Sequence, residues 1–181
     1  MTHIYNELRK SSEVRCEIRP LAPITVELLR RACEPRDATL LSVLAYAGLR
    51  PSEALVLRWE DVRERTILVQ RAIALGGEDD TKNSQDRTVR LLAPLKADLA
   101  EWCMACGRPD GAALVFPTDR DHAWTVAAYQ SWRRRSFLQA VRDSGSAHTT
   151  PYTLRHSFAS LLLHEGARSS TSRASSGTTP A

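Results

Sequence analysis

Three basic residues stand where a side chain can reach away from the element that carries it. Arg50 follows a predicted helix stop, Lys82 lies in a polar loop between two strand candidates, and Arg155 lies on a predicted helix late in the sequence. A guanidinium group is planar, always charged and able to hold a phosphate through two hydrogen bonds. Taken one at a time, each of these residues is more simply a solvated charge. Their meaning therefore depends on the elements that position them.

Apolar residues at helical spacing predict three helices in the first third of the chain, over residues 25–33, 35–47 and 52–59. Thr25 and Ser52 are the expected caps of the first and third helices. Gly48 is the expected stop of the second helix, because glycine accepts the left-handed backbone that ends many helices. Arg50 is thereby placed in the short connection between the second and third helices.

A strand pair is predicted next. Residues 66–74 are β-branched and apolar, and residues 87–91 alternate charged and apolar side chains. The two segments are expected to pair across the polar loop 76–86, which carries Lys82. This hairpin is the only β-structure that the sequence predicts.

Three more helices are predicted after the hairpin, over residues 94–106, 125–142 and 151–166. In the middle one Trp132, Phe137, Leu138 and Val141 are expected inside, with the basic run 133–135 partly outside. Thr150 caps the last one and Pro151 occupies its first position. The order predicts an α+β fold that is mainly helical, with one small antiparallel β-hairpin.

Three segments resemble the motifs of one enzyme family. Their sequences are AGLRPSEAL (47–55) followed by LRWEDV (57–62), then TKNS (81–84) ahead of RTVRL (87–91), and finally PYTLRHSFAS (151–160). They are similar to the first arginine box, the hairpin lysine and the second arginine box of the tyrosine recombinases of the phage integrase type. The resemblance covers about residues 21–166, and three motifs in order at suitable distances are far more specific than one.

The resemblance implies a site for DNA strand exchange without a metal or other cofactor. Arg50 and Arg155 match the two arginines that clamp the scissile phosphate and stabilise the added charge of the transition state. Lys82 matches the lysine that protonates the leaving 5′ oxygen. Glu53 matches an acidic residue of the first box, where it supports the arginine or simply favours the start of a helix.

The second arginine box departs from the family pattern at its first position. The family usually has a histidine there, whereas this sequence has Tyr152, three residues before Arg155 and on the same helix face. Tyrosine can hydrogen-bond a phosphate but is a poorer base than histidine near neutral pH. His156 follows Arg155, as a histidine often does in this family, and it either serves the site or packs the helix; the sequence favours neither.

A second departure concerns the nucleophile, because the family's tyrosine that attacks the phosphate has no counterpart in the sequence. We expect residues 1–20 to be a partly disordered lead-in and residues 21–166 to be a partial catalytic domain. Residues 167–181 are rich in Ser, Thr and Arg, without a large apolar side chain. We expect this tail to be disordered and to come from a shifted reading frame or a truncated copy.

Composition is consistent with this picture but does not establish it. The net charge of +4 and the isoelectric point of about 9.1 permit a polyanionic partner. The absence of a long apolar run or signal peptide predicts a cytoplasmic protein that does not enter a membrane. Cys103 and Cys106 form a lone C-x-x-C pair, which we interpret as ordinary thiols because a zinc site needs further ligands.

The sequence thus predicts a site-specific recombinase relative that binds double-stranded DNA, and other recombinase protomers are further expected partners. It is expected to lack cleavage activity, because no nucleophilic tyrosine is found. Two alternatives stay open: a non-catalytic DNA-binding or interaction module that interferes with an intact recombinase, and a non-functional fragment whose core is left partly uncovered. A helical regulator unrelated to recombination would not bring Arg50, Lys82 and Arg155 together.

Overall fold

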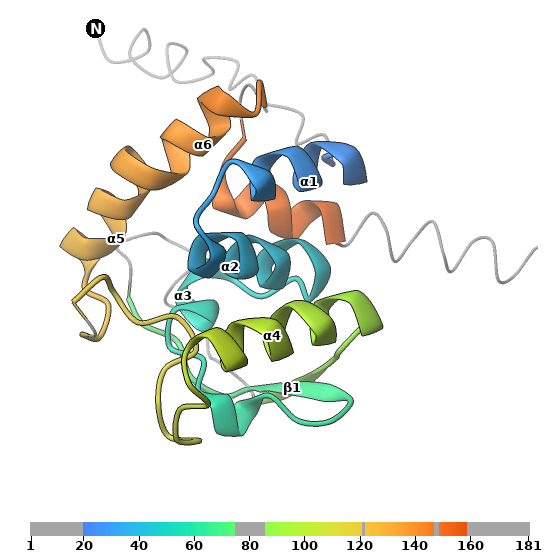
Figure 1. Ribbon diagram of the computed structural model, residues 1–181, viewed down its shortest axis with the longest axis vertical. Coiled ribbons are helices and arrows are strands. Elements are labelled where there is room, and N and C mark those ends of the chain that lie inside the picture. Colours follow the sequence, from blue (N-terminus) through green and yellow to red (C-terminus); the bar gives the residue numbers. More distant parts are fainter. Residues whose placement is uncertain (1–19, 75–85, 121, 147–148, 159–181) are drawn as a thin grey trace, which may run out of the picture.

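The computed structural model describes residues 20–74, 86–120, 122–146 and 149–158 of the 181-residue chain. Lys82 and residues 159–166 lie outside these ranges, as do residues 1–19 of the predicted lead-in and the whole tail. The described part is mainly helical with one two-stranded antiparallel sheet, which confirms the predicted fold class. Figure 1 shows the helices gathered around α2, with the small sheet at one end of the domain.

The first helix, α1 (Pro23–Arg31), begins two residues earlier than predicted. Its cap position is held by Ala22 rather than by Thr25, because a proline at the first helical position has its backbone already set for a helix and has no N–H to satisfy. The second helix, α2 (Pro35–Tyr46), also begins at a proline. Nearly all of its residues from position 39 onward are buried, so α2 forms the centre of the hydrophobic core.

Gly48 ends the second helix in the predicted way. Its φ of +62° lies in the left-handed region, which residues with a Cβ rarely adopt. A Cβ built on Gly48 would lie 2.2 Å from Cδ1 of Phe158, which belongs to the last described helix (residues 151–158). Gly48 therefore serves both a backbone turn and a close approach between two segments that are far apart in the sequence.

The third helix differs from the prediction. It spans only Pro51–Ala54 (α3), and its N-cap is Arg50, whereas Ser52 lies inside the helix and is buried. The predicted cap was wrong because Pro51 again fixes the first helical position one residue earlier. A short 3-10 helix, η1 (Trp59–Asp61), takes the place of the expected continuation.

The sheet pairs β1 (Thr66–Val69) with β2 (Arg87–Arg90) in antiparallel register, with Thr66 opposite Arg90. The first strand was predicted to reach residue 74 and ends five residues earlier. The strand ends at Val69, opposite Arg87, the first residue of β2. The side chains that follow bind Asp61, which accepts hydrogen bonds from Gln70 Nε2 at 2.8 Å and Arg71 Nη1 at 2.7 Å.

After the sheet, α4 (Ala93–Ala105) packs against α2 and follows the predicted range to within one residue. A helical run then extends over α5 (Val126–Trp132), the π-helical turn η3 (Arg133–Phe137) and α6 (Leu138–Asp143). Thr125 caps the start of this run, because its side chain accepts a hydrogen bond from the backbone N–H of Ala128.

The π-helical turn explains one error in the predicted core. Trp132 and Phe137 are both buried with ring centroids 5.6 Å apart, yet residues five apart in an α-helix point roughly 140° away from each other. The i→i+5 bonding of a π-turn brings such residues onto one face. The same shift turns Leu138 outward, where 41% of it is exposed, instead of inside as predicted. The residues 133–135 are all exposed.

A buried polar contact fastens this helical run to α2. The Asp37 carboxylate accepts a hydrogen bond from Trp132 Nε1 at 2.8 Å and another from Arg36 Nε at 2.9 Å. Only 5% of Asp37 is exposed, and a buried carboxylate needs such donors.

The last described helix, residues 151–158, begins as predicted. The Thr150 hydroxyl accepts a hydrogen bond from the backbone N–H of Thr153 at 3.0 Å, and Leu154 is fully buried. Ser157 is buried as well and accepts a hydrogen bond from the backbone N–H of Leu21 at 2.8 Å. The helix lies between α1 and α2 in Figure 1, so the end of the described chain packs against its beginning.

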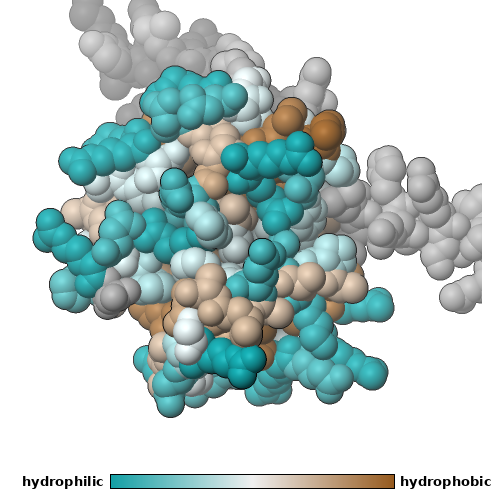
Figure 2. Space-filling model, in the orientation of Figure 1, coloured by the Kyte–Doolittle hydropathy of each residue, from teal (hydrophilic) through white to brown (hydrophobic). Residues whose placement is uncertain are grey.

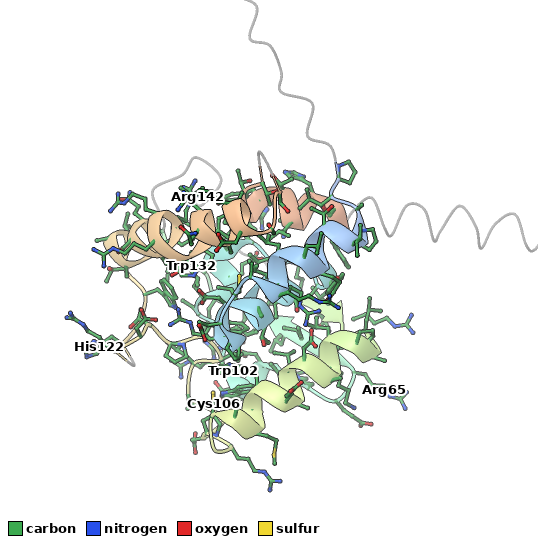
Figure 3. The ribbon with its side chains drawn as sticks, turned by 45° about the horizontal axis from the view of Figure 1, so that its top comes forward. Arg65, Trp102, Cys106, His122, Trp132 and Arg142 are labelled. Atoms are coloured by element: carbon green, nitrogen blue, oxygen red, sulfur yellow. The ribbon has the colours of Figure 1, made fainter. Side chains whose placement is uncertain are left out.

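The surface is mostly hydrophilic on the face shown in Figure 2. Apolar side chains reach it over α1, where Ile24 and Leu28 are 66% and 44% exposed. Charged side chains such as Arg65 and the imidazole of His122 extend away from the body of the domain (Figure 3). Within the described ranges no helix combines the length and the apolar character that a membrane span requires.

Candidate functional site

The candidate site is built around one buried carboxylate. The side chain of Glu53 is only 2% exposed, and three guanidinium groups from different elements approach it. Arg50 comes from the N-cap of α3, Arg87 from the first position of β2, and Arg155 from the helix 151–158. Their side chains remain 34%, 34% and 29% exposed, respectively. The site therefore has an anionic centre within the protein and a cationic rim that faces solvent.

The distances rank the three arginines. Arg87 holds Glu53 in a bidentate pair, with both nitrogen–oxygen distances at 2.7 Å. The Arg50 side chain donates a single hydrogen bond from Nη1 to Glu53 Oε1 at 3.1 Å. Arg155 Nη1 lies 3.8 Å from Glu53 Oε2, which is an ion pair but not a hydrogen bond.

The fold places Glu53 and Arg50 through the start of α3. Glu53 is the third residue of this helix, and its Oε2 accepts a hydrogen bond from the backbone N–H of Arg50 at 2.7 Å. That N–H has no partner within the helix, so a carboxylate at this position satisfies it. Pro51 fixes the turn between the two residues. The short helix thus fixes the carboxylate directly beneath the Arg50 side chain.

Arg155 is placed by the close approach at Gly48. Arg155 Nη1 donates a hydrogen bond to the backbone oxygen of Gly48, the residue against which the Phe158 ring packs. Because glycine has no side chain, the helix that carries Arg155 can lie against the turn that precedes Arg50. The two arginine boxes of the sequence therefore meet at this turn.

The electrostatics keep the cluster charged. Burial raises the pKa of Glu53, but hydrogen bonds from Arg87 and Arg50 outweigh it and hold that pKa below its ordinary value. Burial and the neighbouring charge of Arg50 lower the pKa of Arg155, which nonetheless stays cationic because a guanidinium does not lose its proton in proteins. Three guanidinium cations and one carboxylate leave a net charge of about +2.

Tyr152 and His156 flank Arg155 on the same helix. Tyr152 is half-buried and close enough to raise the pKa of Arg155 electrostatically, although this effect is smaller than those of burial and Arg50. His156 is exposed, so its ring does not pack inside the core. Lys82 lies outside the described residues, and its position relative to the arginines stays a prediction.

Arg87 is the member of the cluster that sequence reasoning missed. It was assigned only to a strand, where an arginine is usually solvated. The signal was available in the strand's alternation: Arg87 shares the half-buried face with Val89, whereas Thr88 and Arg90 are exposed. An arginine on the inward face of a strand needs an acidic partner, but only the fold reveals that this partner is Glu53.

The arrangement suits an oxyanion held at the protein surface. Two partly exposed guanidinium groups can each offer paired donors to a phosphate, and a buried carboxylate orients them from below. Among the described residues no group of three His, Cys, Asp or Glu side chains could hold a metal ion. Within the described part of the chain, Cys103 and Cys106 at the end of α4 belong to no such group.

Comparison with known proteins identifies the family of this chain. The sequence profile of the phage integrase family matches residues 21–172. Tyrosine recombinase XerD of Yersinia pestis is 33% identical over 142 residues, which cover 74% of this chain and 43% of that protein. Tyrosine recombinase XerC of Methylobacterium sp. (strain 4-46) is 36% identical over 135 residues, covering 71% of this chain and 37% of that protein. The chain spans less than half the length of these relatives.

Solved structures show the same fold. XerA recombinase superposes with a TM-score of 0.65 at 24% identity, over 82% of this chain and 52% of that one. The catalytic core of lambda integrase superposes with a TM-score of 0.58 at 14% identity, over 81% and 84% of the two chains. The Tn1549 transposon integrase in complex with circular intermediate DNA gives a TM-score of 0.63 at 21% identity, over 82% and 55%. By its sequence and its fold, the chain belongs to the phage integrase family, the tyrosine recombinases.

Proposed function

We propose that this chain binds the phosphate backbone of double-stranded DNA at the arginine cluster, as the phosphate-holding part of a site for site-specific recombination. One observation carries the proposal. Arg50 and Arg155, which lie far apart in the sequence, converge on the same buried carboxylate and keep about a third of their side chains exposed. Two arginines held side by side at a surface form a receptor for a phosphodiester.

The charge of the cluster fits the chemistry of phosphoryl transfer. Negative charge spreads over the non-bridging oxygens in the transition state, and fixed cations stabilise it there. Arg50 and Arg155 are assigned to this clamp. Lys82 is assigned to protonation of the leaving oxygen, as the resemblance implies, and Tyr152 to a supporting hydrogen bond at the position where the family usually has histidine.

We further propose that this chain does not attack the phosphate itself. Among the described residues, Tyr46 donates a hydrogen bond to Glu27 at 2.8 Å and Tyr129 is buried among aromatic rings. Tyr152 flanks Arg155, but it occupies the position of the family's histidine rather than that of the nucleophile. Burial raises the pKa of Tyr46 and thereby disfavours the phenolate that attacks phosphorus. The expected activity is therefore phosphate binding without strand cleavage.

Binding is tested by fluorescence anisotropy with a labelled duplex over a series of salt concentrations. Arg50→Ala and Arg155→Ala should each weaken binding about tenfold and reduce the slope of log K against log salt by about 0.9, the value for one lost phosphate contact. Arg65→Ala is the matched control, because Arg65 is exposed and points away from the domain (Figure 3). Equal effects of all three variants would refute the assignment of the site.

Cleavage is tested separately with a suicide duplex that traps covalent intermediates. The chain should give no protein–DNA band that survives denaturant. Such a band, mapped by mass spectrometry to any tyrosine of the chain, would overturn the proposal that it binds without attack.

A further inference from the structure

Glu53 has no acceptor capacity left in this structure. An ionised carboxylate offers about four lone-pair positions, two on each oxygen. Its Oε1 accepts from Arg87 Nη1 at 2.7 Å and from Arg50 Nη1 at 3.1 Å. Its Oε2 accepts from Arg87 Nη2 and from the Arg50 backbone N–H, both at 2.7 Å. Four donors therefore fill four positions, and Arg87 supplies two of them.

This saturation leaves no position on Glu53 for Arg155, whose Nη1 instead donates a hydrogen bond to the backbone oxygen of Gly48. Its Nη1 lies 3.8 Å from Glu53 Oε2, which is too long for a hydrogen bond. If Arg87 were absent, one acceptor position would open on each oxygen of a nearly fully buried anion. A buried carboxylate with open positions draws the nearest cation strongly. Arg155, already within ion-pair distance, would be the cation drawn in.

We propose that Arg87 is a positioning residue that saturates Glu53 and so keeps Arg155 available for a DNA phosphate. This inference rests on the proposed function of the site. The Arg87–Glu53 pair is neutral as a whole, which leaves the two positive charges of Arg50 and Arg155 directed at the ligand. Arg87 itself does not need to contact the phosphate, because its Nη1 and Nη2 already bind the two oxygens of the carboxylate.

The position of Arg87 in the sheet suits this role. It is the first residue of β2 and lies on the strand face that turns inward, opposite Val69 of β1. A side chain on a paired strand is held more firmly than one on a loop. Arg90, on the same strand but on its exposed face, provides a matched control of equal charge.

The role predicts a specific pattern in DNA binding. Arg87→Ala should weaken duplex binding about tenfold, as expected when one charge-assisted phosphate contact is lost. Arg90→Ala should weaken it less than threefold. The double variant Arg87→Ala/Glu53→Gln should recover most of the lost affinity, because a neutral amide no longer captures Arg155. A merely structural role of Arg87 predicts the opposite, since the second substitution would then add further damage.

A second readout does not depend on DNA. In the free protein, the Nε–Hε NMR signal of Arg155 should shift in Arg87→Ala and return in the double variant, while Arg87→Lys should give a partial shift because lysine lacks the fork. An unchanged Arg155 signal in Arg87→Ala would overturn the inference even if DNA binding holds. Conversely, if the wild-type chain shows no Arg50-dependent DNA binding, the proposed function fails, and the NMR signal alone decides whether Arg87 holds Arg155 in place.

Discussion

The close approach at Gly48 gives the sharpest test of how the fold builds the site. The Cβ introduced by Gly48→Ala destabilises the folded state in two ways. The left-handed backbone at φ +62° costs an L-residue about 1–2 kcal/mol. The Cβ would also lie 2.2 Å from Cδ1 of Phe158 and 2.9 Å from both Cε1 and Cγ, so the ring and its helix must move.

Overpacking of this kind costs about 1–3 kcal/mol, which gives about 2–5 kcal/mol in total for Gly48→Ala. A chain of this size loses roughly 2–4 °C of Tm for each kcal/mol, so a drop of about 5 °C or more is expected in thermal unfolding followed by circular dichroism. The affinity for a DNA duplex should fall as well, because the Gly48 carbonyl is the hydrogen-bond acceptor of Arg155.

Gly145→Ala separates the two penalties. Gly145 has a φ of +67°, close to that of Gly48, but a Cβ there would meet nothing within 4 Å. This variant should pay only the backbone cost of about 1–2 kcal/mol and leave DNA affinity unchanged. If the two alanine variants are equally stable, the contact with Phe158 does not constrain the turn, and the argument for how Arg155 is placed fails.

Three other predictions concern buried groups. Glu53 has a pKa below its ordinary value in the folded protein. Its stabilising contacts are therefore complete above the unfolded pKa of about 4.3 and are lost as the pH falls through the folded pKa. In urea titrations the wild type should lose stability on acidification more steeply than Glu53→Gln. Trp132→Phe removes one of the donors to Asp37 and should lower the free energy of unfolding in urea by about 1–3 kcal/mol. A loss below about 0.5 kcal/mol would contradict the need for that hydrogen bond. Burial, with the nearby charge of Asp37, raises the pKa of Cys33 to about 12, so iodoacetamide at pH 8 should label the exposed Cys106 much faster, as peptide mass spectrometry would show.

Local signals in the sequence predicted most of the elements but not their details. Gly48 and Pro35 marked the ends of α2 correctly because proline and glycine act through their own backbone. The same effect was overlooked at Pro23 and Pro51, where the cap was predicted three and two residues too late, respectively. The end of β1 could not be predicted from its own residues, because the strand pairs only as far as Val69, opposite the first residue of β2.

The π-turn was present in the sequence as a spacing that was interpreted as an ordinary helix. Trp132 and Phe137 are five residues apart, which an α-helix cannot place on one face, and the chain resolves the conflict with a π-turn rather than by exposing an aromatic ring. Burying either ring is worth about 1.5–3 kcal/mol, more than the irregular hydrogen bonding of one turn needs to cost. Leu138 is exposed as a result.

The residues of the site also differ in whether the sequence could predict them. Arg50, Glu53 and Arg155 were identified from motifs whose residues are neighbours in the chain, whereas Arg87 acquires its role only through pairing between elements. The motifs place Arg50 and Arg155 beside the Glu53 carboxylate, which is only 2% exposed. They do not explain why Arg155 makes no hydrogen bond to it. A third arginine that takes up the remaining acceptor positions resolves that question. In such a cluster the number of cations has to exceed what the buried anion can bind, because only the excess is left to hold a phosphate.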